Sequence, residues 1–202
     1  MPSIYDLKPA FQKLLRPLSR SLAAAGLTPN GVTLAALGLS FAVGAAIAWR
    51  PDARWPLLLL PLALFVRMAL NALDGMMARE LGMQSRRGAI LNELGDVASD
   101  TALYLPLALA PGVPAALMVG VVLLAVISEM TGVVAVQVGA TRRYDGPMGK
   151  SDRAFVFGAL GLALGLGAPG GRWVGVLLGL VLLLLLLTIR NRARGALREV
   201  AP

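Results

Sequence analysis

The sequence contains no cysteine and no histidine among its 202 residues. The absence of cysteine excludes disulfide bridges, thiolate metal sites and thiol nucleophiles. The absence of histidine removes the side chain that most often transfers protons near neutral pH, so proton transfer must use carboxylates, water or substrate groups. Charged residues are also few, at 15% of the chain. Any chemistry of this protein therefore depends on a small number of acids, amides and basic side chains.

Hydrophobic residues make up 57% of the chain, which is more than a soluble domain of this length needs. Long apolar segments predict an all-α integral membrane protein. The formal net charge of +8 is compatible with nucleic-acid binding. However, the basic residues cluster beside the apolar segments, which is typical of contacts with anionic lipid head groups and of topology signals. We therefore expect membrane lipids, and no nucleic acid, as partners.

The first 26 residues have apolar side chains at helical spacing, with lysines and arginines between them. This pattern predicts an amphipathic helix that lies on the membrane surface and bends near Pro17, and the alternative is an ordinary packed helix. The charges are interspersed with the apolar positions, so no cleavable signal peptide is expected. The apolar positions are Ile4, Leu7, Phe11, Leu14, Leu15, Leu18 and Leu22.

Six further segments are apolar enough to be predicted as membrane spans. We expect a single membrane domain over residues 1–202, with the surface helix at 1–26 and a six-helix bundle at 31–189. Pro51 and the run from Pro111 to Pro114 mark turns between segments. The predicted spans are Gly31–Trp49, Trp55–Leu73, Gly88–Ala110, Val113–Val138, Ala154–Gly167 and Arg172–Ile189.

The distribution of lysine and arginine predicts the orientation of these spans. Arg50, Arg54 and Arg172 fall on one side, whereas fifteen basic residues fall in the N-terminal helix, the second-to-third and fourth-to-fifth connections and the C-terminus. The excess of positive charge places both termini in the cytoplasm, which agrees with an even number of spans. The expected location is a bacterial inner membrane.

Residues 71–100 place acids and amides in or beside apolar segments, where an unpartnered acid costs about 3 kcal/mol or more. Clustered oxygen ligands suit hard cations such as Mg²⁺ or Mn²⁺, and the nearby Arg79, Arg86 and Arg87 suit phosphate. Two helical faces would meet near the cytoplasmic surface. One face carries Asn71, Asp74 and Ala78, and the other carries Gly88, Asn92, Asp96 and Asp100.

The same residues form a long motif with fixed spacing. Asp74-Gly75-x-x-Ala78-Arg79 is followed by Gly88, Asn92 and Asp96. This order resembles the signature D-x-x-D-G-x-x-A-R-x8-G-x3-D-x3-D of the CDP-alcohol phosphatidyltransferases. The run Thr28-Pro29-Asn30-x-x-Thr33, the pair Gly149-Lys150 and the surface helix followed by six spans are also similar to that family, so the resemblance covers nearly the whole chain.

The resemblance implies a Mg²⁺- or Mn²⁺-dependent homodimeric enzyme. It would transfer a phosphatidyl group from CDP-diacylglycerol to an alcohol and release CMP. By position in the signature, Asp74 is the second metal-binding acid, and Asp96 is the fourth acid and the candidate base for the acceptor hydroxyl. The resemblance also implies a CDP site that comprises Thr28, Asn30, Asp74, Gly75, Ala78, Arg79 and Gly88.

The chain departs from the signature at two positions, because Asn71 and Asn92 stand where the family has its first and third acids. An amide oxygen binds a hard cation but brings no charge. The alternatives are a weaker pair of ions, a single ion, or substitution by Glu93, which could equally be solvated or paired with an arginine. An inactive family member that binds lipid or nucleotide is the second hypothesis. A small transporter is the third, and the intact Asp-Gly-x-x-Ala-Arg spacing argues against it.

Four basic residues precede the fifth predicted span. They would hold a phosphorylated acceptor or the donor phosphates, and the alternative is a loop that only sets the topology. The alternatives for the acceptor are glycerol 3-phosphate, an inositol or inositol phosphate, serine or a less usual alcohol. The four basic residues favour an anionic one, such as glycerol 3-phosphate or an inositol phosphate. The four residues are Arg142, Arg143, Lys150 and Arg153.

Arg67 lies within the second predicted span, seven residues before Asp74. Intramembrane charges usually pair, and helix geometry places Asp100 at a similar depth on the next span. We predict a structural Arg67–Asp100 ion pair, with Glu129 as the competing partner.

Overall fold

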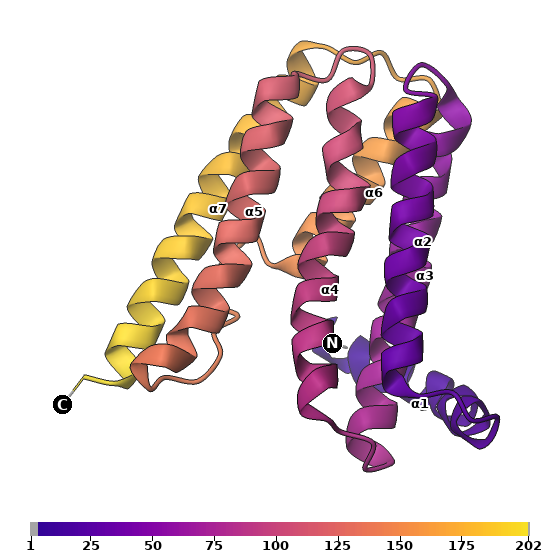
Figure 1. The fold of residues 1–202 in the computed structure, drawn as a ribbon. Coiled ribbons are helices and arrows are strands. Elements are labelled where there is room, and N and C mark those ends of the chain that lie inside the picture. Colours follow the sequence, from indigo (N-terminus) through magenta and orange to yellow (C-terminus); the bar gives the residue numbers. More distant parts are fainter. Residues whose placement is uncertain (1–3, 202) are drawn as a thin grey trace. The chain divides into compact units, whose positions relative to one another are not determined.

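The protein is described by a computed structural model that covers residues 4–201, with side chains from residue 11 onward. Within this range the chain is helical and contains no strand, which confirms the all-α class (Figure 1). The elements are α1 (Ile4–Ala24), α2 (Pro29–Trp49), α3 (Arg54–Glu80), α4 (Arg86–Tyr104), η1 (Leu105–Leu109), α5 (Ala115–Val134), η2 (Ala135–Val138), α6 (Lys150–Gly165) and α7 (Arg172–Glu199).

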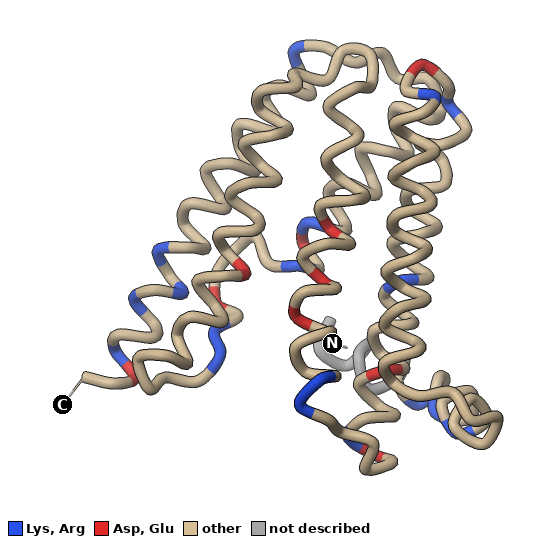
Figure 2. Tube along the Cα trace, viewed as in Figure 1, with Lys and Arg blue, Asp and Glu red and all other residues tan. Residues whose placement is uncertain are grey.

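Four segments of the described chain are long and apolar enough to cross a membrane, namely α2, α3, α5 with η2, and α7. The protein is therefore a membrane protein. α4 carries Glu93, Asp96 and Asp100 at successive turns (Figure 2), and α6 has only 16 residues. The count of six spans and the cytoplasmic position of both termini stay predictions.

Several helix ends differ from the predicted spans for local reasons. α4 gives way to the 3₁₀ segment η1, which has Pro106 near its start. Proline lacks the N–H that would continue the α-helical hydrogen bonds. η2 ends at Val138, and its C-cap Gly139 adopts a left-handed conformation with a φ of 90°. α6 begins at Lys150, four residues before the predicted span, because the carboxylate of Asp152 accepts the N–H of Gly149 at 2.9 Å.

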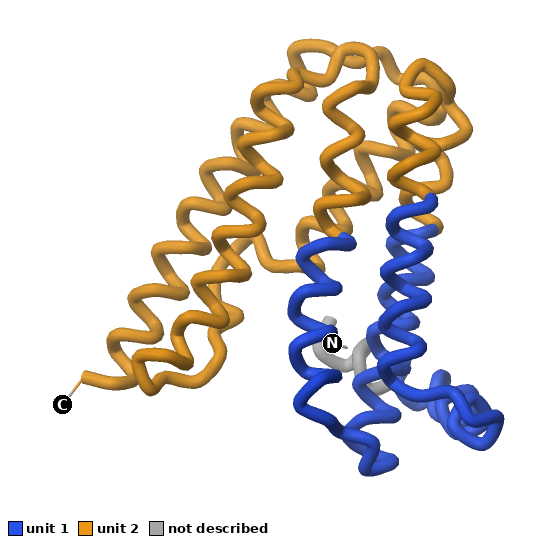
Figure 3. The backbone as a smooth tube through the Cα atoms, in the orientation of Figure 1, with its two compact units in different colours: residues 1–42, 63–99 blue, residues 43–62, 100–202 orange. Residues whose placement is uncertain are grey.

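The described chain forms two compact units, and the division falls within α2, α3 and α4 (Figure 3). Unit 1 comprises residues 1–42 and 63–99, and unit 2 comprises residues 43–62 and 100–202. The prediction of one membrane domain over residues 1–202 stays a prediction.

Unit 1 is built around contacts of α1 with α2 and α3. Val32, Leu73 and Met77 are buried together, and Leu15 and Leu22 of α1 pack against them. Leu14 and Leu18 of the same helix are exposed. The helix continues without a break through Pro17. An exposed ion pair between Arg16 and Glu80, with Nε and Oε2 2.9 Å apart, joins α1 to the end of α3. Helix α1 therefore packs against the rest of unit 1 and also exposes leucines, and its position on a membrane surface stays a prediction.

Unit 2 includes α5 and α7, which lie side by side (Figure 1). The connection after η2 is fastened to the last turn of α7 through Glu199. Its carboxylate accepts hydrogen bonds from the backbone N–H and hydroxyl of Thr141, both at 2.9 Å, and from Arg143 at 2.6 Å. Arg143 also donates to Asp145, and this hydrogen bond lowers the pKa of the Asp145 carboxyl below its usual range. The last turn of α7 is thus part of the folded unit.

The C-terminal half of α2 approaches α4 closely within unit 2. A Cβ at Gly44 would overlap the carbonyl carbon and oxygen of Ala102, so only glycine permits this approach. In the same unit, the rings of Tyr104 and Phe157 pack with their centroids 4.4 Å apart. Backbone contact at a small residue is a usual way to pack helices in membranes.

We predict that Gly44→Ala lowers the stability of the purified protein, because overpacking at a backbone contact costs about 1–3 kcal/mol. Thermal unfolding in detergent would measure the change. Gly38→Ala in the same helix is the matched control, because a Cβ there meets nothing within 4 Å. Equal unfolding temperatures for the two variants would show that the α2–α4 approach does not limit stability.

Candidate functional site

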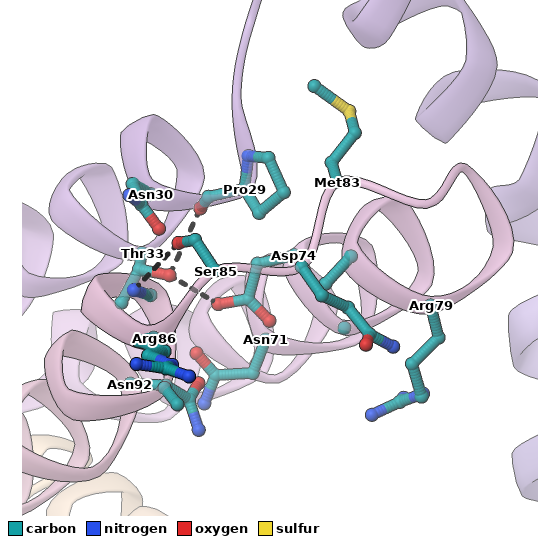
Figure 4. A pocket seen from close by; sticks show the side chains of 15 residues that line it. Pro29, Asn30, Thr33, Asn71, Asp74, Arg79, Met83, Ser85, Arg86 and Asn92 are labelled. Atoms are coloured by element: carbon teal, nitrogen blue, oxygen red, sulfur yellow. Dashed lines mark hydrogen bonds between the residues drawn. The ribbon is translucent and has the colours of Figure 1, made fainter.

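A pocket of about 700 Å³ lies in unit 1, where the N-terminal ends of α2 and α4 meet the C-terminal half of α3 (Figure 4). Eight of the residues that the sequence predicts for the donor and metal sites line it. α2 contributes Asn30, α3 contributes Asn71, Asp74, Gly75, Ala78 and Arg79, and α4 contributes Gly88 and Asn92.

Two helix N-termini, each capped by a hydroxyl, border this pocket. Thr28 Oγ1 accepts the N–H of Gly31 at 3.2 Å and caps α2, whose first residue is Pro29. Ser85 Oγ accepts the N–H of Gly88 at 2.9 Å and caps α4. Helix N-termini carry partial positive charge and present free N–H groups, so both favour an anion. The predicted contact of Thr28 with CDP stays a prediction.

Two glycines leave room for polar side chains at the pocket wall. A Cβ at Gly88 would lie 2.7 Å from Asn30 Oδ1 and 2.9 Å from Ser85 Oγ. A Cβ at Gly75 would lie 2.8 Å from the guanidinium of Arg79. The missing side chains let polar groups of neighbouring elements reach the pocket, which suits a ligand that binds close to the backbone.

The acid inside the pocket is held in place by α2. Asp74 is 5% exposed, and its Oδ2 lies 2.7 Å from the hydroxyl of Thr33. The same hydroxyl lies 3.0 Å from the carbonyl oxygen of Pro29, so one hydrogen has two possible acceptors. Because Thr33 is buried on α2 and Asp74 on α3, this contact fixes the carboxylate relative to both helices.

Asp96 is linked to the pocket wall through Asn71. The amide Nδ2 of Asn71 donates to Asp96 Oδ1 at 3.3 Å. Arg67, which is 3% exposed, places Nη2 at 3.4 Å from the same carboxylate oxygen and 3.0 Å from the Asp96 carbonyl oxygen. The candidate base is therefore held by an amide and by a buried guanidinium.

The donors in this region fit a hard cation, since they are carboxylate and amide oxygens without competing nitrogen or sulfur ligands. Asp74 and Asp96 supply charge, and Asn71 and Asn92 supply neutral oxygens. Within the described residues, no group of three or more acids, histidines or cysteines is placed to hold a metal ion. The set therefore fits Mg²⁺ or Mn²⁺ only with substrate or water oxygens completing the coordination.

Unit 2 holds a second polar group, the arginine cluster, which comprises Arg142, Arg153 and Arg192 with Asp100 and Glu129. Arg153 donates to Asp100 at 2.8 Å and to Glu129 at 3.0 Å. Arg142 and Arg192 reach the same glutamate at 3.1 and 3.4 Å. Arg192 also donates to the carbonyl oxygen of Ser128. Three arginines around two acids leave one formal positive charge in this largely buried cluster.

The structure distributes the remaining predicted residues as follows. Arg143 pairs with Asp145 and Glu199, and Lys150 stands at the start of α6. The described contacts join Arg67 to Asp96 and Asp100 to Arg153. The Arg67–Asp100 pair, the role of Glu93 as a ligand and the phosphate contacts of the four basic residues stay predictions.

The roles of three residues in these sites were not predicted from the sequence, although Thr33 belongs to the run from Thr28 to Thr33 that is similar to the family. Thr33 holds Asp74, Ser85 caps α4 at the pocket, and Arg192 completes the arginine cluster. The signal for Ser85 is its position just before a helix, where Ser is a preferred cap. Arg192 is one of four arginines after the last predicted span, and no local signal in the sequence distinguishes it from the other three.

Comparison with known proteins identifies relatives along most of the chain. The family model described as CDP-alcohol phosphatidyltransferase matches residues 26–190. "Inner membrane protein YnbA" of Escherichia coli (strain K12) is 46% identical over 197 residues, which cover 96% of each protein. A "Phosphatidylinositol phosphate synthase" of Mycobacterium marinum is 37% identical over 97 residues, which cover 47% of this chain and 39% of that protein.

Solved structures share the fold. Phosphatidylinositol phosphate synthase of Mycobacterium tuberculosis with CDP-DAG bound superposes with a TM-score of 0.78 at 21% identity, covering 94% of this chain and 96% of that one. The same enzyme in complex with manganese and citrate gives a TM-score of 0.77 at 22% identity, with 92% and 90% covered. At this identity the likeness shows the fold alone.

We predict that Glu129→Gln destabilises the protein by about 3–5 kcal/mol, because it leaves buried arginines without their shared carboxylate. Thermal unfolding in detergent measures this. Glu80→Gln is the control, since it removes an exposed glutamate that pairs with a single arginine, and it should change stability little. Unfolding at the wild-type temperature after Glu129→Gln would refute the structural role of the cluster.

Proposed function

Because this chain belongs to the CDP-alcohol phosphatidyltransferase family, we propose that it transfers a phosphatidyl group from CDP-diacylglycerol to an alcohol and releases CMP. The observation that carries this proposal is the pocket itself. It combines two capped helix N-termini with Asp74, Gly75, Ala78 and Arg79 at the spacing of the family signature.

We propose that the pocket takes the cytidine diphosphate part of the donor. Its two phosphates would lie against the N-termini of α2 and α4, with Arg79 and Arg86 as charged partners in the wall. Gly75 and Gly88 would allow the nucleotide to approach the backbone. The solved neighbour with CDP-DAG bound supports this choice of donor.

In the proposed reaction the acceptor hydroxyl attacks the phosphorus that carries diacylglycerol. The new bond joins the acceptor oxygen to this phosphorus, the bond from phosphorus to the bridging pyrophosphate oxygen breaks, and CMP leaves. Asp96 would accept the hydroxyl proton. Arg67 and Asn71 would keep its carboxylate oriented through the contacts at 3.4 and 3.3 Å.

The family and the manganese complex of the solved neighbour support a divalent ion in this site. We propose Mg²⁺ or Mn²⁺, held by Asp74 with the amide oxygens of Asn71 and Asn92. Asp96 and the substitute ligand Glu93 would contribute only to a second ion. When bound, such an ion makes the phosphorus more electrophilic and stabilises charge on the leaving CMP.

We propose an anionic alcohol as the acceptor, such as glycerol 3-phosphate or an inositol phosphate. Arg142, the most exposed arginine of the cluster, and Lys150 at the start of α6 support this class. Relatives named phosphatidylinositol phosphate synthases are consistent with it. Six spans, cytoplasmic termini, an active site that faces the cytoplasm and a homodimer complete the proposal, on the basis of loop charges and family resemblance.

We predict that Asp96→Asn abolishes CMP release while the protein stays folded, because an amide cannot accept the hydroxyl proton. The assay supplies CDP-diacylglycerol, Mg²⁺ or Mn²⁺ and a panel of alcohols, and it measures CMP. Asp52→Asn is the control, since it neutralises an exposed acid in the α2–α3 connection. Near-normal turnover of Asp96→Asn would refute Asp96 as the base.

We also predict that Gly88→Ala raises the KM for CDP-diacylglycerol about tenfold or more, because the new methyl group would displace Asn30 or Ser85 from the pocket wall. The KM for the acceptor should change little. Gly38→Ala serves again as the glycine control. An unchanged donor KM would argue that the nucleotide does not bind at this wall.

One observation favours a second function, in which the protein binds lipid or nucleotide without turnover. Asn71 donates its amide hydrogen to Asp96 where the family signature has an acid. The same assay separates the two functions. CDP-diacylglycerol binding with no CMP release for any acceptor would select the binding function, and acids restored at positions 71 and 92 should then produce release.

A further inference from the structure

Asn71 separates two sides of the candidate metal site. Its amide nitrogen donates to Asp96 at 3.3 Å, and Figure 4 shows its amide oxygen on the side of Asp74. A carboxylate at this position would present an oxygen in both directions, whereas an amide presents an oxygen in only one. A cation can therefore share Asn71 with Asp74, but the nitrogen side of Asn71 repels a cation next to Asp96.

The nitrogen side already contains a fixed positive charge. Arg67 is 3% exposed, and its Nη2 lies 3.4 Å from Asp96 Oδ1 and 3.0 Å from the carbonyl oxygen of the same residue. An arginine stays protonated at any relevant pH, so this charge is permanent. In a poorly solvated site, a divalent ion close to the guanidinium would be strongly repelled.

The formal charges lead to the same conclusion. The four-acid signature brings four negative charges, which match two divalent ions. Here the four signature positions bring two, from Asp74 and Asp96, and Arg67 cancels one of them. One divalent ion then leaves a single positive charge in the site, whereas two ions would leave three, which a buried site tolerates poorly.

We propose that this protein binds one divalent cation per chain, on the Asp74 side of Asn71, and that Arg67 takes the place of a second cation beside Asp96. This deepens the proposed function and rests on it. Arg67 acts as a positioning residue, because it contacts Asp96, which would in turn meet the substrate. It holds both the backbone and the side chain of that residue relative to α3.

Binding of Mn²⁺ to the purified wild-type protein in detergent tests the number of ions. Titration should give one ion per chain, and the electron paramagnetic resonance spectrum should be that of isolated Mn²⁺. Two ions per chain, a spectrum with coupling between neighbouring Mn²⁺ ions, or no binding would each overturn the proposal. Neither readout depends on turnover.

Two further variants test the role of Arg67. Asn71→Asp with Asn92→Asp restores the four acids, and a second variant adds Arg67→Met to these changes. If Arg67 excludes the second ion, that ion should bind at least about ten times more tightly in the variant without the arginine, since a buried charge of the same sign opposes it. Equal affinities in the two variants would reject the role of Arg67.

Controls separate this inference from the proposed function. Arg50→Met in the same restored-acid background removes an exposed arginine and should leave Mn²⁺ binding unchanged. Arg67→Lys keeps the charge and provides a folded variant if Arg67→Met unfolds, with the second ion still excluded. CMP release is measured in parallel. Its absence from the wild type with every acceptor would reject the transferase proposal, while one bound Mn²⁺ would still support the single-ion site.

Discussion

An ionised side chain among apolar helices costs several kcal/mol unless an opposite charge and hydrogen bonds compensate it, and the polar architecture of this protein is organised around that cost. In unit 1 the buried Arg67 contacts Asp96. In unit 2 the buried Arg153 and Arg192 share Glu129. These buried arginines are therefore gathered with acids into compact groups.

The backbone supplies much of what the pocket offers an anion. Only 15% of the residues are charged, so few charged side chains are available to bind phosphate. The N–H groups at the starts of α2 and α4 supply further hydrogen-bond donors, and Thr28 and Ser85 fix both helix starts with side-chain hydrogen bonds. Partial charges of this kind need no counter-ion. They therefore avoid the free-energy cost of burying an ionised side chain among the helices.

Much of the site was predictable, because the spacing of the signature residues is helical. Asn71, Asp74 and Ala78 follow steps of three and four, as do Gly88 and Asn92, so each set falls on one face and lines one pocket. The contact of Arg67 with Asp96 was harder to predict. Acids recur along α4 at successive turns, so several of them lie within the range of one arginine. The observed contact with Asp96 lies one turn of helix from Asp100, and the predicted pair with Asp100 stays a prediction.

Helix boundaries and caps were harder to predict from the sequence, since they depend on single hydrogen bonds. Asp152 starts α6 at Lys150, and Pro106 converts the end of α4 to 3₁₀ geometry. Arg192 could not be assigned from the sequence because its neighbours are also basic. Only the fold of unit 2 shows that it meets Ser128 and Glu129.

The clasp at Glu199 has a practical consequence for work with this protein. Its carboxylate, in the last turn of α7, holds Thr141 and Arg143. A purification tag or fluorescent fusion joined directly after this turn would crowd these contacts. A flexible glycine- and serine-rich spacer would keep the added domain clear of the 141–145 connection.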